Sequence, residues 1–229
     1  DDAIATAASS VAFDLWRAVA VTYASSYLRA SVGANPCGYS FALAVPANEN
    51  AAAVRAVWSA DGAGIPPGSG VVIRDSLASG ADPAAPGLRC LRELWTGDSA
   101  DARRLQASIA ATAVRLPRAG LPIWVIHGAA DGLLPPAFSS QPYVTWLRAE
   151  GRHPLFWWVP YAQHFDAFLP LPGFGDRHVP LLPFGYRALD QVLDHLLHGT
   201  PLTQPPQPHT RPRGPGSLSR RNLDWPAHG

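Results

Sequence analysis

Two short apolar runs separated by a helix-sized segment constrain the fold of this chain more than any other feature. The first run is Leu-Pro-Ile-Trp-Val-Ile at 121–126, and the second is Leu-Phe-Trp-Trp-Val-Pro at 155–160. Continuous apolar runs of this length are typical of strands that are buried on both faces of a parallel sheet. The segment between them carries Val144 and Leu147 as apolar positions and ends near Gly151, so it predicts a helix. Because parallel neighbours need such a connection, we expect an α/β fold in which the two runs pair in parallel.

A polar residue with catalytic potential follows each run. Asp131 comes shortly after the first run, and His164 comes shortly after the second, 33 residues further along the chain. Loops at the carboxyl ends of adjacent parallel strands converge, so we expect a carboxylate oxygen of Asp131 within hydrogen-bond reach of a His164 ring nitrogen. A carboxylate on one ring nitrogen fixes the tautomer, and the other nitrogen can then take a proton from a hydroxyl. The order acid, then histidine, is that of the back half of an α/β-hydrolase triad.

Each of these residues alone also has a purely structural interpretation. An Asp-Gly pair such as that at 131–132 often forms only a turn, and a single histidine after a strand is often a hydrogen-bonded surface residue. His127 competes with His164 as the candidate base, but its place at the tip of the first run favours packing beneath the Asp131 loop. The pair at this spacing, with each member after a buried strand, favours the catalytic interpretation.

The sequence offers no nucleophile to accompany this pair. No Gly-x-Ser-x-Gly occurs in the chain, and the serines at 9–10, 40, 69 and 76 lack the flanking glycines of a strand-to-helix elbow. The chain also contains no Met, which suggests a processed product or an excerpt. We therefore expect the nucleophile and the oxyanion-hole donors to lie before residue 1. On this basis, residues 1–229 alone should hydrolyse esters no better than a His164→Ala variant.

The first 118 residues predict a mainly helical, lid-like segment, which precedes an acid- and histidine-bearing portion at 119–199. One amphipathic helix or two in succession are expected between Ile4 and Ser31, and Ser99 is a suitable cap for a later helix. The other expected features are helices at 51–59, 88–95 and 100–115, an extended piece at 40–45 and a Gly/Pro-rich loop at 61–70. The fold class we expect is thus the C-terminal portion of an α/β-hydrolase-like fold with an incomplete parallel sheet.

A closing helix and a tail are expected after the histidine. Residues 184–197 predict a helix that stops at Gly199. Its expected apolar face consists of Tyr186, Leu189, Val192, Leu193, Leu196 and Leu197. From residue 200 onward, Pro, Gln, Arg and Ser follow one another without periodicity, which predicts a disordered tail at 200–229.

Composition and spacing exclude several functional classes. The formal net charge of +1 gives no reason to expect a nucleic-acid partner, and no run approaches the ~20 apolar residues that span a bilayer. His164, Asp166, Asp176 and His178 match no compact metal-ligand spacing, and no phosphate-binding loop follows a strand, so we expect no metal and no cofactor. The two cysteines, at 37 and 90, could pair in an exported protein or remain two buried thiols.

Several segments resemble the C-terminal part of bacterial D-(-)-3-hydroxybutyrate oligomer hydrolases. The His-Gly-x-x-Asp pattern at 127–131 is common to many α/β-hydrolases, whereas the aromatic-rich stretch after His164 is more particular to this family. The resemblance covers roughly residues 1–200. The segments that carry it are FDLWRAVAVTYA at 13–24, NPCGYSF at 35–41, RCLR at 89–92, HGAADGLLP at 127–135, and the run from YAQHFDAF at 161–168 to residue 197.

The resemblance implies an exported serine esterase, secreted or periplasmic, that cleaves short (R)-3-hydroxybutyrate oligomers to monomers in polyhydroxybutyrate breakdown. Its partner would be this small-molecule ester, without nucleic acid or membrane; the oligomeric state stays open. Only Asp131 and His164 carry over as site residues, because the family's serine lies upstream of the matched region. Two alternatives remain open: an inactive truncated remnant, and a generic carboxylesterase or peptidase of the same fold.

Overall fold

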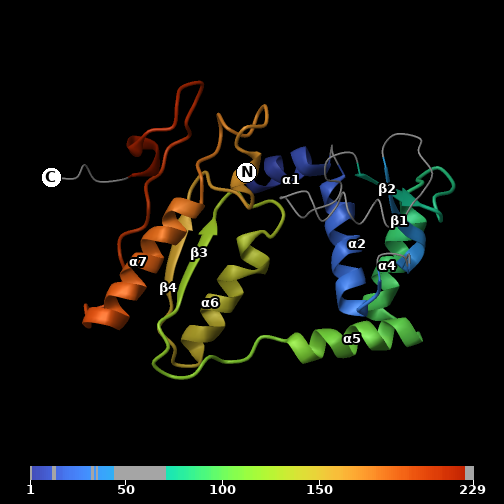
Figure 1. Cartoon of the computed structure of the whole chain (residues 1–229), viewed down its shortest axis with the longest axis horizontal. Helices are drawn as coiled ribbons and strands as arrows, with labels where there is room; N and C mark the ends of the chain where they lie inside the picture. The colour runs from blue at the N-terminus through green and yellow to red at the C-terminus, as the bar shows by residue number, and fades with distance from the viewer. Residues whose placement is uncertain (1, 12–13, 32–33, 35, 44–70, 225–229) are drawn as a thin grey trace. The chain divides into compact units, whose positions relative to one another are not determined.

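The computed structural model of the chain contains two compact units (Figure 1), and it describes residues 2–11, 14–31, 34, 36–43 and 71–224. One unit comprises residues 11–114 and is called the helical unit here. The other comprises residues 1–10 and 115–229 and is called the C-terminal unit. The expected helix at 51–59 and the expected loop at 61–70 lie outside the described residues.

The helical unit consists of three helices and a two-stranded antiparallel sheet in its described part. The helices are α2 (Leu15–Leu28), α4 (Ala85–Thr96) and α5 (Ala100–Thr112). Strands β1 (Tyr39–Leu43) and β2 (Val71–Asp75) pair antiparallel, with the short helix η2 (Pro36–Gly38) directly before β1. The buried residues at the centre of the unit are Val21, Ala24, Leu28, Tyr39, Leu91, Leu94 and Leu105.

Specific contacts in the helical unit confirm one sequence expectation and answer one question that the sequence left open. Ser99 caps α5 as predicted, because its side chain accepts a hydrogen bond from the Ala102 amide at 3.1 Å. The question of the cysteines is resolved, since Cys37 and Cys90 form a disulfide that links η2 to α4.

The first helix belongs to the C-terminal unit rather than to the helical segment in which we expected it. The predicted helical region at 4–31 forms two helices, and the first is α1 (Asp2–Val11). A Cβ added to Gly132 would lie 2.4 Å from the Ala3 carbonyl oxygen and from the Ala7 amide nitrogen of α1. Glycine and alanine therefore allow α1 to pack closely on the acid-bearing loop, a tertiary contact that the local sequence pattern does not reveal.

The C-terminal unit is built on the two predicted parallel strands. Strand β3 (Trp124–Gly128) pairs in parallel with β4 (Leu155–Val159), in a register that places Ile126 opposite Trp157. The prediction of parallel neighbours is thus confirmed. The connection runs through η3 (Pro136–Phe138) and α6 (Ser140–Ala149), while α7 (Leu182–His198) flanks the pair on the other side (Figure 1).

Helix α7 stops where predicted but buries a different face. Gly199 ends it in the left-handed region with φ 72°, a conformation that glycine adopts readily. The predicted apolar face is wrong, because Phe184 and Ala188 are the buried residues. Five of the six residues we assigned to the core are exposed: Tyr186, Leu189, Leu193, Leu196 and Leu197.

The tail is ordered as far as residue 224, so the prediction of disorder is wrong for that part. Phe156 bonds through its amide to the Gln204 side chain at 3.0 Å and through its carbonyl oxygen to the Gln207 side chain at 2.8 Å. The Gln207 side chain also accepts from the Trp158 amide at 2.9 Å. A glutamine side chain offers N–H donors and a C=O acceptor, as the backbone does, so an irregular, proline-rich segment can pair with a strand edge. The short helix η5 (Arg220–Leu223) follows this segment.

Candidate active site

The loop after β3 holds Asp131 in a fixed orientation. The side chain is buried, with 3% of the residue exposed. Its Oδ1 accepts hydrogen bonds from the amides of Leu133 at 3.0 Å and Leu134 at 2.9 Å, and the Asp131 amide donates to the Gly128 carbonyl at 3.1 Å. Oδ1 is thus occupied by the backbone of its own loop, and Oδ2 is available to side chains.

A glycine at the end of β3 lets the histidine-bearing loop approach the acid-bearing loop. A Cβ added to Gly128 would lie 2.4 Å from the Ala162 carbonyl oxygen, a distance that real Cβ atoms do not show. The two loops are joined there by hydrogen bonds from the Ala129 amide to the Val159 carbonyl at 2.8 Å and from the Ala130 amide to the Ala162 carbonyl at 2.9 Å. His164 is therefore brought to Asp131 by backbone contacts immediately before it.

The predicted contact between acid and histidine is confirmed. Nδ1 of His164 lies 2.9 Å from Oδ2 of Asp131. Since a carboxylate only accepts, Nδ1 carries the proton, and Nε2 is left as the basic nitrogen in the neutral ring. The imidazole is about one-third exposed, and no hydroxyl in the described part of the chain forms a hydrogen bond with Nε2. The pair can therefore act as a general base on a group supplied from elsewhere.

His127 is a second imidazole on the same carboxylate, and sequence reasoning placed it near the loop without assigning it this contact. Its Nε2 lies 3.3 Å from Oδ2 of Asp131 and 3.0 Å from the Leu134 carbonyl oxygen. Both neighbours are acceptors, so this nitrogen carries the proton and donates. The i,i+4 spacing between His127 and Asp131 is the sequence signal that could have indicated the contact.

These hydrogen bonds determine the charge state of the acid. Burial by itself would raise the pKa of Asp131. The hydrogen bonds from His127 and His164 and from the Leu134 amide outweigh burial and hold the pKa of Asp131 well below its usual range. The acid is thus ionised at neutral pH, which is the form that stabilises an imidazolium at His164.

The other polar residues near the histidine have structural partners. Asp166 accepts the amides of Leu181 and Leu182 at 2.7 and 2.8 Å and so caps the start of α7. His178 is buried and bonds to the Phe174 carbonyl and the Thr6 hydroxyl. Within the described ranges, no three His, Cys, Asp or Glu side chains are arranged to hold a metal ion. The helices described are all too short or too polar to cross a bilayer.

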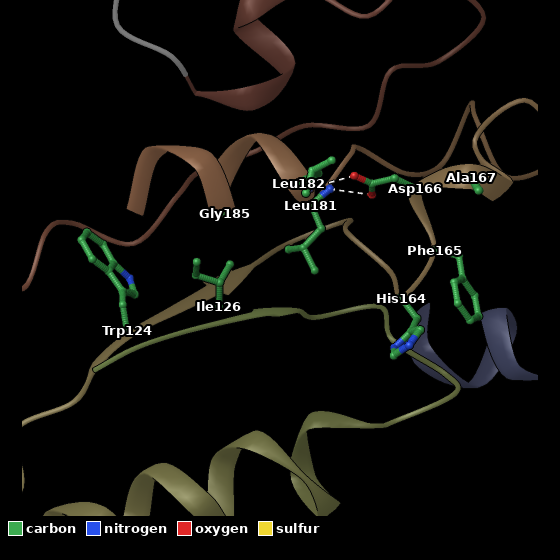
Figure 2. A pocket seen from close by; sticks show the side chains of 9 residues that line it. All are labelled: Trp124, Ile126, His164, Phe165, Asp166, Ala167, Leu181, Leu182 and Gly185. Atoms are coloured by element: carbon green, nitrogen blue, oxygen red, sulfur yellow. Dashed lines mark hydrogen bonds between the residues drawn. The ribbon is translucent and has the colours of Figure 1, made fainter. Parts of the chain in front are cut away.

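A cavity of about 520 Å³ opens beside the imidazole. Figure 2 shows His164 and Phe165 at one end and Trp124 of β3 at the other, with Ile126 between them. The first turn of α7 closes the opposite wall through Leu181, Leu182 and Gly185 (Figure 2).

Comparison with known proteins gives a consistent set of relatives. The family described as 3HB-oligomer hydrolase matches residues 1–223. A D-(-)-3-hydroxybutyrate oligomer hydrolase of Paracidovorax citrulli is 39% identical over 92% of this chain and 33% of its own length. A protein with the same name from Paraburkholderia xenovorans is 37% identical over 90% of this chain and 31% of its own length. Another from Cupriavidus pinatubonensis is 38% identical over 88% of this chain and 32% of its own length. The chain thus spans about a third of these relatives, and no solved structure matches it.

Proposed function

The chain belongs to the family of 3HB-oligomer hydrolases, and from this premise we propose that it supplies the acid and the general base of an enzyme that cleaves (R)-3-hydroxybutyrate oligomers to monomers. The observation that carries the proposal is the 2.9 Å contact between a buried, ionised Asp131 and a partly exposed His164. The substrate class comes from the names of the relatives, which are oligomer hydrolases.

The proposed mechanism is that of a serine esterase. Nε2 of His164 takes the proton of a serine hydroxyl as that oxygen attacks the ester carbonyl, and Asp131 stabilises the resulting imidazolium. The same proton then passes to the alkoxide of the departing 3-hydroxybutyrate unit. In the second half, His164 takes a proton from a water that attacks the acyl carbon, and it returns this proton to the serine oxygen as the acyl group leaves as the free acid. The serine and the oxyanion-hole donors come from polypeptide outside this chain in this proposal.

We propose for the same reasons that the C-terminal unit is the acid- and histidine-bearing end of an α/β-hydrolase-like fold. The order strand β3, Asp131, helix α6, strand β4, His164 supports this assignment.

The disulfide supports a secreted or periplasmic location. The bond between Cys37 and Cys90 is of the kind that persists in oxidising compartments and is rare in a reducing cytosol. Export of the enzyme would also bring it to substrate released outside the cell.

Activity of a longer polypeptide tests the proposed function. The 229-residue chain and the same chain extended by the sequence encoded ahead of it would be incubated with (R)-3-hydroxybutyrate trimer, and the released monomer measured. We expect turnover from the extended form only, with a loss on the order of 10³-fold or more in His164→Ala. His153→Ala is the matched control, because this histidine is exposed and precedes β4, at the opposite end of the strand from His164. An extended form that keeps its activity in His164→Ala, or that has none, would contradict the proposal.

A further inference from the structure

We propose that the open edge of β3, the cavity beside His164 and an exposed stripe of α7 form one surface, which receives a strand and a helix from the additional polypeptide that the relatives carry. This surface is called the assembly surface here. The choice of occupant rests on the proposed function, whereas the hydrogen-exchange measurement below tests the surface separately from ester hydrolysis.

The two edges of the β3–β4 sheet differ in their hydrogen bonding. Backbone groups of successive residues point to alternate sides of a strand. Ile123 and Ala129 form hydrogen bonds with β4. Trp124 and Ile126 therefore direct their N–H and C=O groups away from β4. No partner for these four groups occurs in the described part of the chain. The opposite edge, on β4, is covered by the side chains of Gln204 and Gln207. Among the residues that the structure describes, the β3 edge is therefore the one that remains available to extend the sheet.

Helix α7 presents a second apolar stripe, which lies roughly 140° around the helix from its buried one. The stripe consists of Leu182, Tyr186, Leu189, Leu193 and Leu196, which are 43–61% exposed. Their spacing is 4, 3, 4 and 3 residues, the pattern that packs against another helix. Five large, exposed apolar side chains in one row indicate a surface that a partner covers.

The cavity connects the strand edge with the helix stripe. Trp124 and Ile126 contribute to the cavity from β3, and Leu182 contributes from α7, where it is also the first residue of the stripe (Figure 2). The indole Nε1 of Trp124 is inaccessible to solvent and has no acceptor. An unsatisfied buried donor costs ~1–3 kcal/mol, so the packing around Trp124 is incomplete in the described part of the chain.

The same polypeptide is a better occupant of the assembly surface than a second copy of this chain. The chain covers only 31–33% of the relatives' length, so they carry ample further sequence. A second copy could pair its own β3 edge, but it would bring only another acid–histidine pair. Nε2 of His164 needs a hydroxyl, and an added strand next to β3 would end beside this nitrogen.

Residue-resolved amide hydrogen exchange tests the proposal. We expect the amides of Trp124 and Ile126 to exchange rapidly in the 229-residue chain and at least about 100-fold more slowly in the extended polypeptide. The amides of Phe156 and Trp158 serve as internal controls, because the glutamine side chains cover them in both forms.

A charged substitution on the stripe gives a second readout. Leu189→Glu combined with Leu193→Glu should abolish the added protection at Trp124 and Ile126 in the extended polypeptide, while leaving the melting temperature of the 229-residue chain unchanged. Leu218→Glu is the matched control, since this leucine is 41% exposed and lies outside the surface.

Three results would overturn the proposal. The first is equally fast exchange of the two β3 amides in both polypeptides. The second is protection that already exists in the 229-residue chain; if this protection rises with protein concentration, the occupant is a second copy. The third is protection in the extended polypeptide that the stripe substitutions leave intact.

Discussion

Replacing Asp131 by Asn tests how strongly the site is organised around one carboxylate. The substitution keeps the size of the side chain and the acceptor that Leu133 and Leu134 use at 3.0 and 2.9 Å. The NH₂ group, however, replaces Oδ2 and faces the ring nitrogens of His164 and His127, which are donors at 2.9 and 3.3 Å. Two hydrogen bonds to a charged acceptor are lost, and donors are placed against donors.

The magnitude follows from burial and from the number of bonds. A hydrogen bond to a charged group contributes ~1.5–3 kcal/mol, so losing two of them should lower the free energy of unfolding by about 3–6 kcal/mol at neutral pH. This is a large part of the ~5–15 kcal/mol that stabilises an ordinary domain. In the extended polypeptide, the wrong histidine tautomer would also lower kcat by ~10⁴-fold.

Urea unfolding at several pH values measures the effect. The folded-state pKa of Asp131 lies below that of the unfolded chain, ~3.9, so its contribution is fully present above about pH 4 and is lost as the pH falls further. We therefore expect the stability difference between wild type and Asp131→Asn to be large at pH 5 and to narrow by pH 3. Because Asn does not titrate, the stability difference narrows only through the wild type, which loses the contribution of ionised Asp131 as the pH falls.

Asp194 provides a matched control. It forms an acid–histidine contact of the same length, 2.9 Å to Nδ1 of His198, but both side chains are exposed. Exposed pairs contribute little, so Asp194→Asn should leave unfolding unchanged within error. A loss in Asp131→Asn no larger than in this control, or a difference that stays constant between pH 5 and pH 3, would refute the reasoning.

Two further predictions concern the disulfide and the tail. The bond between Cys37 and Cys90 closes a loop with a sequence separation of 53 residues, for which the chain-entropy model gives about 4 kcal/mol of stabilisation. Replacing both cysteines by serine should therefore lower the free energy of unfolding of the helical unit, measured in urea, by about 2–4 kcal/mol. Unchanged unfolding would contradict this. Gln204→Ala with Gln207→Ala should uncover the edge of β4 and produce concentration-dependent association in light scattering. Scattering equal to that of the wild type would show that the glutamines do not protect this edge.

The parts of the structure that the sequence predicted are those with a local signal. The apolar runs that became β3 and β4 are continuous and short, and Asp131 and His164 each follow one of them within a few residues. Parallel pairing then requires the two loops to meet, so the contact between acid and histidine followed from the order of elements alone. The cap at Ser99 was predictable for the same reason, since its partner is three residues away.

The tail was mispredicted because its stabilising contacts are distant in sequence. Gln204 pairs with Phe156 across 48 residues, and Thr210 donates to the Pro160 carbonyl across 50. Prolines at 201, 205, 206 and 208 remove backbone donors and the periodicity of regular elements, so a local reading predicts disorder. Side-chain amides supplied the missing pairing, and composition alone does not specify where such amides will bind.

The error on α7 has a different cause, and it bears on how the unit is completed. An amphipathic pattern identifies apolar positions but not which neighbour covers each of them. Phe184 and Ala188 of α7 pack on the two strands present. The exposed stripe of α7, which includes Leu189 and Leu193, does not. A helix with two apolar rows belongs between two packing partners, and the described chain provides one. Four residues of the predicted face belong to the exposed stripe, and we expect them to become core in the assembly proposed above: Tyr186, Leu189, Leu193 and Leu196.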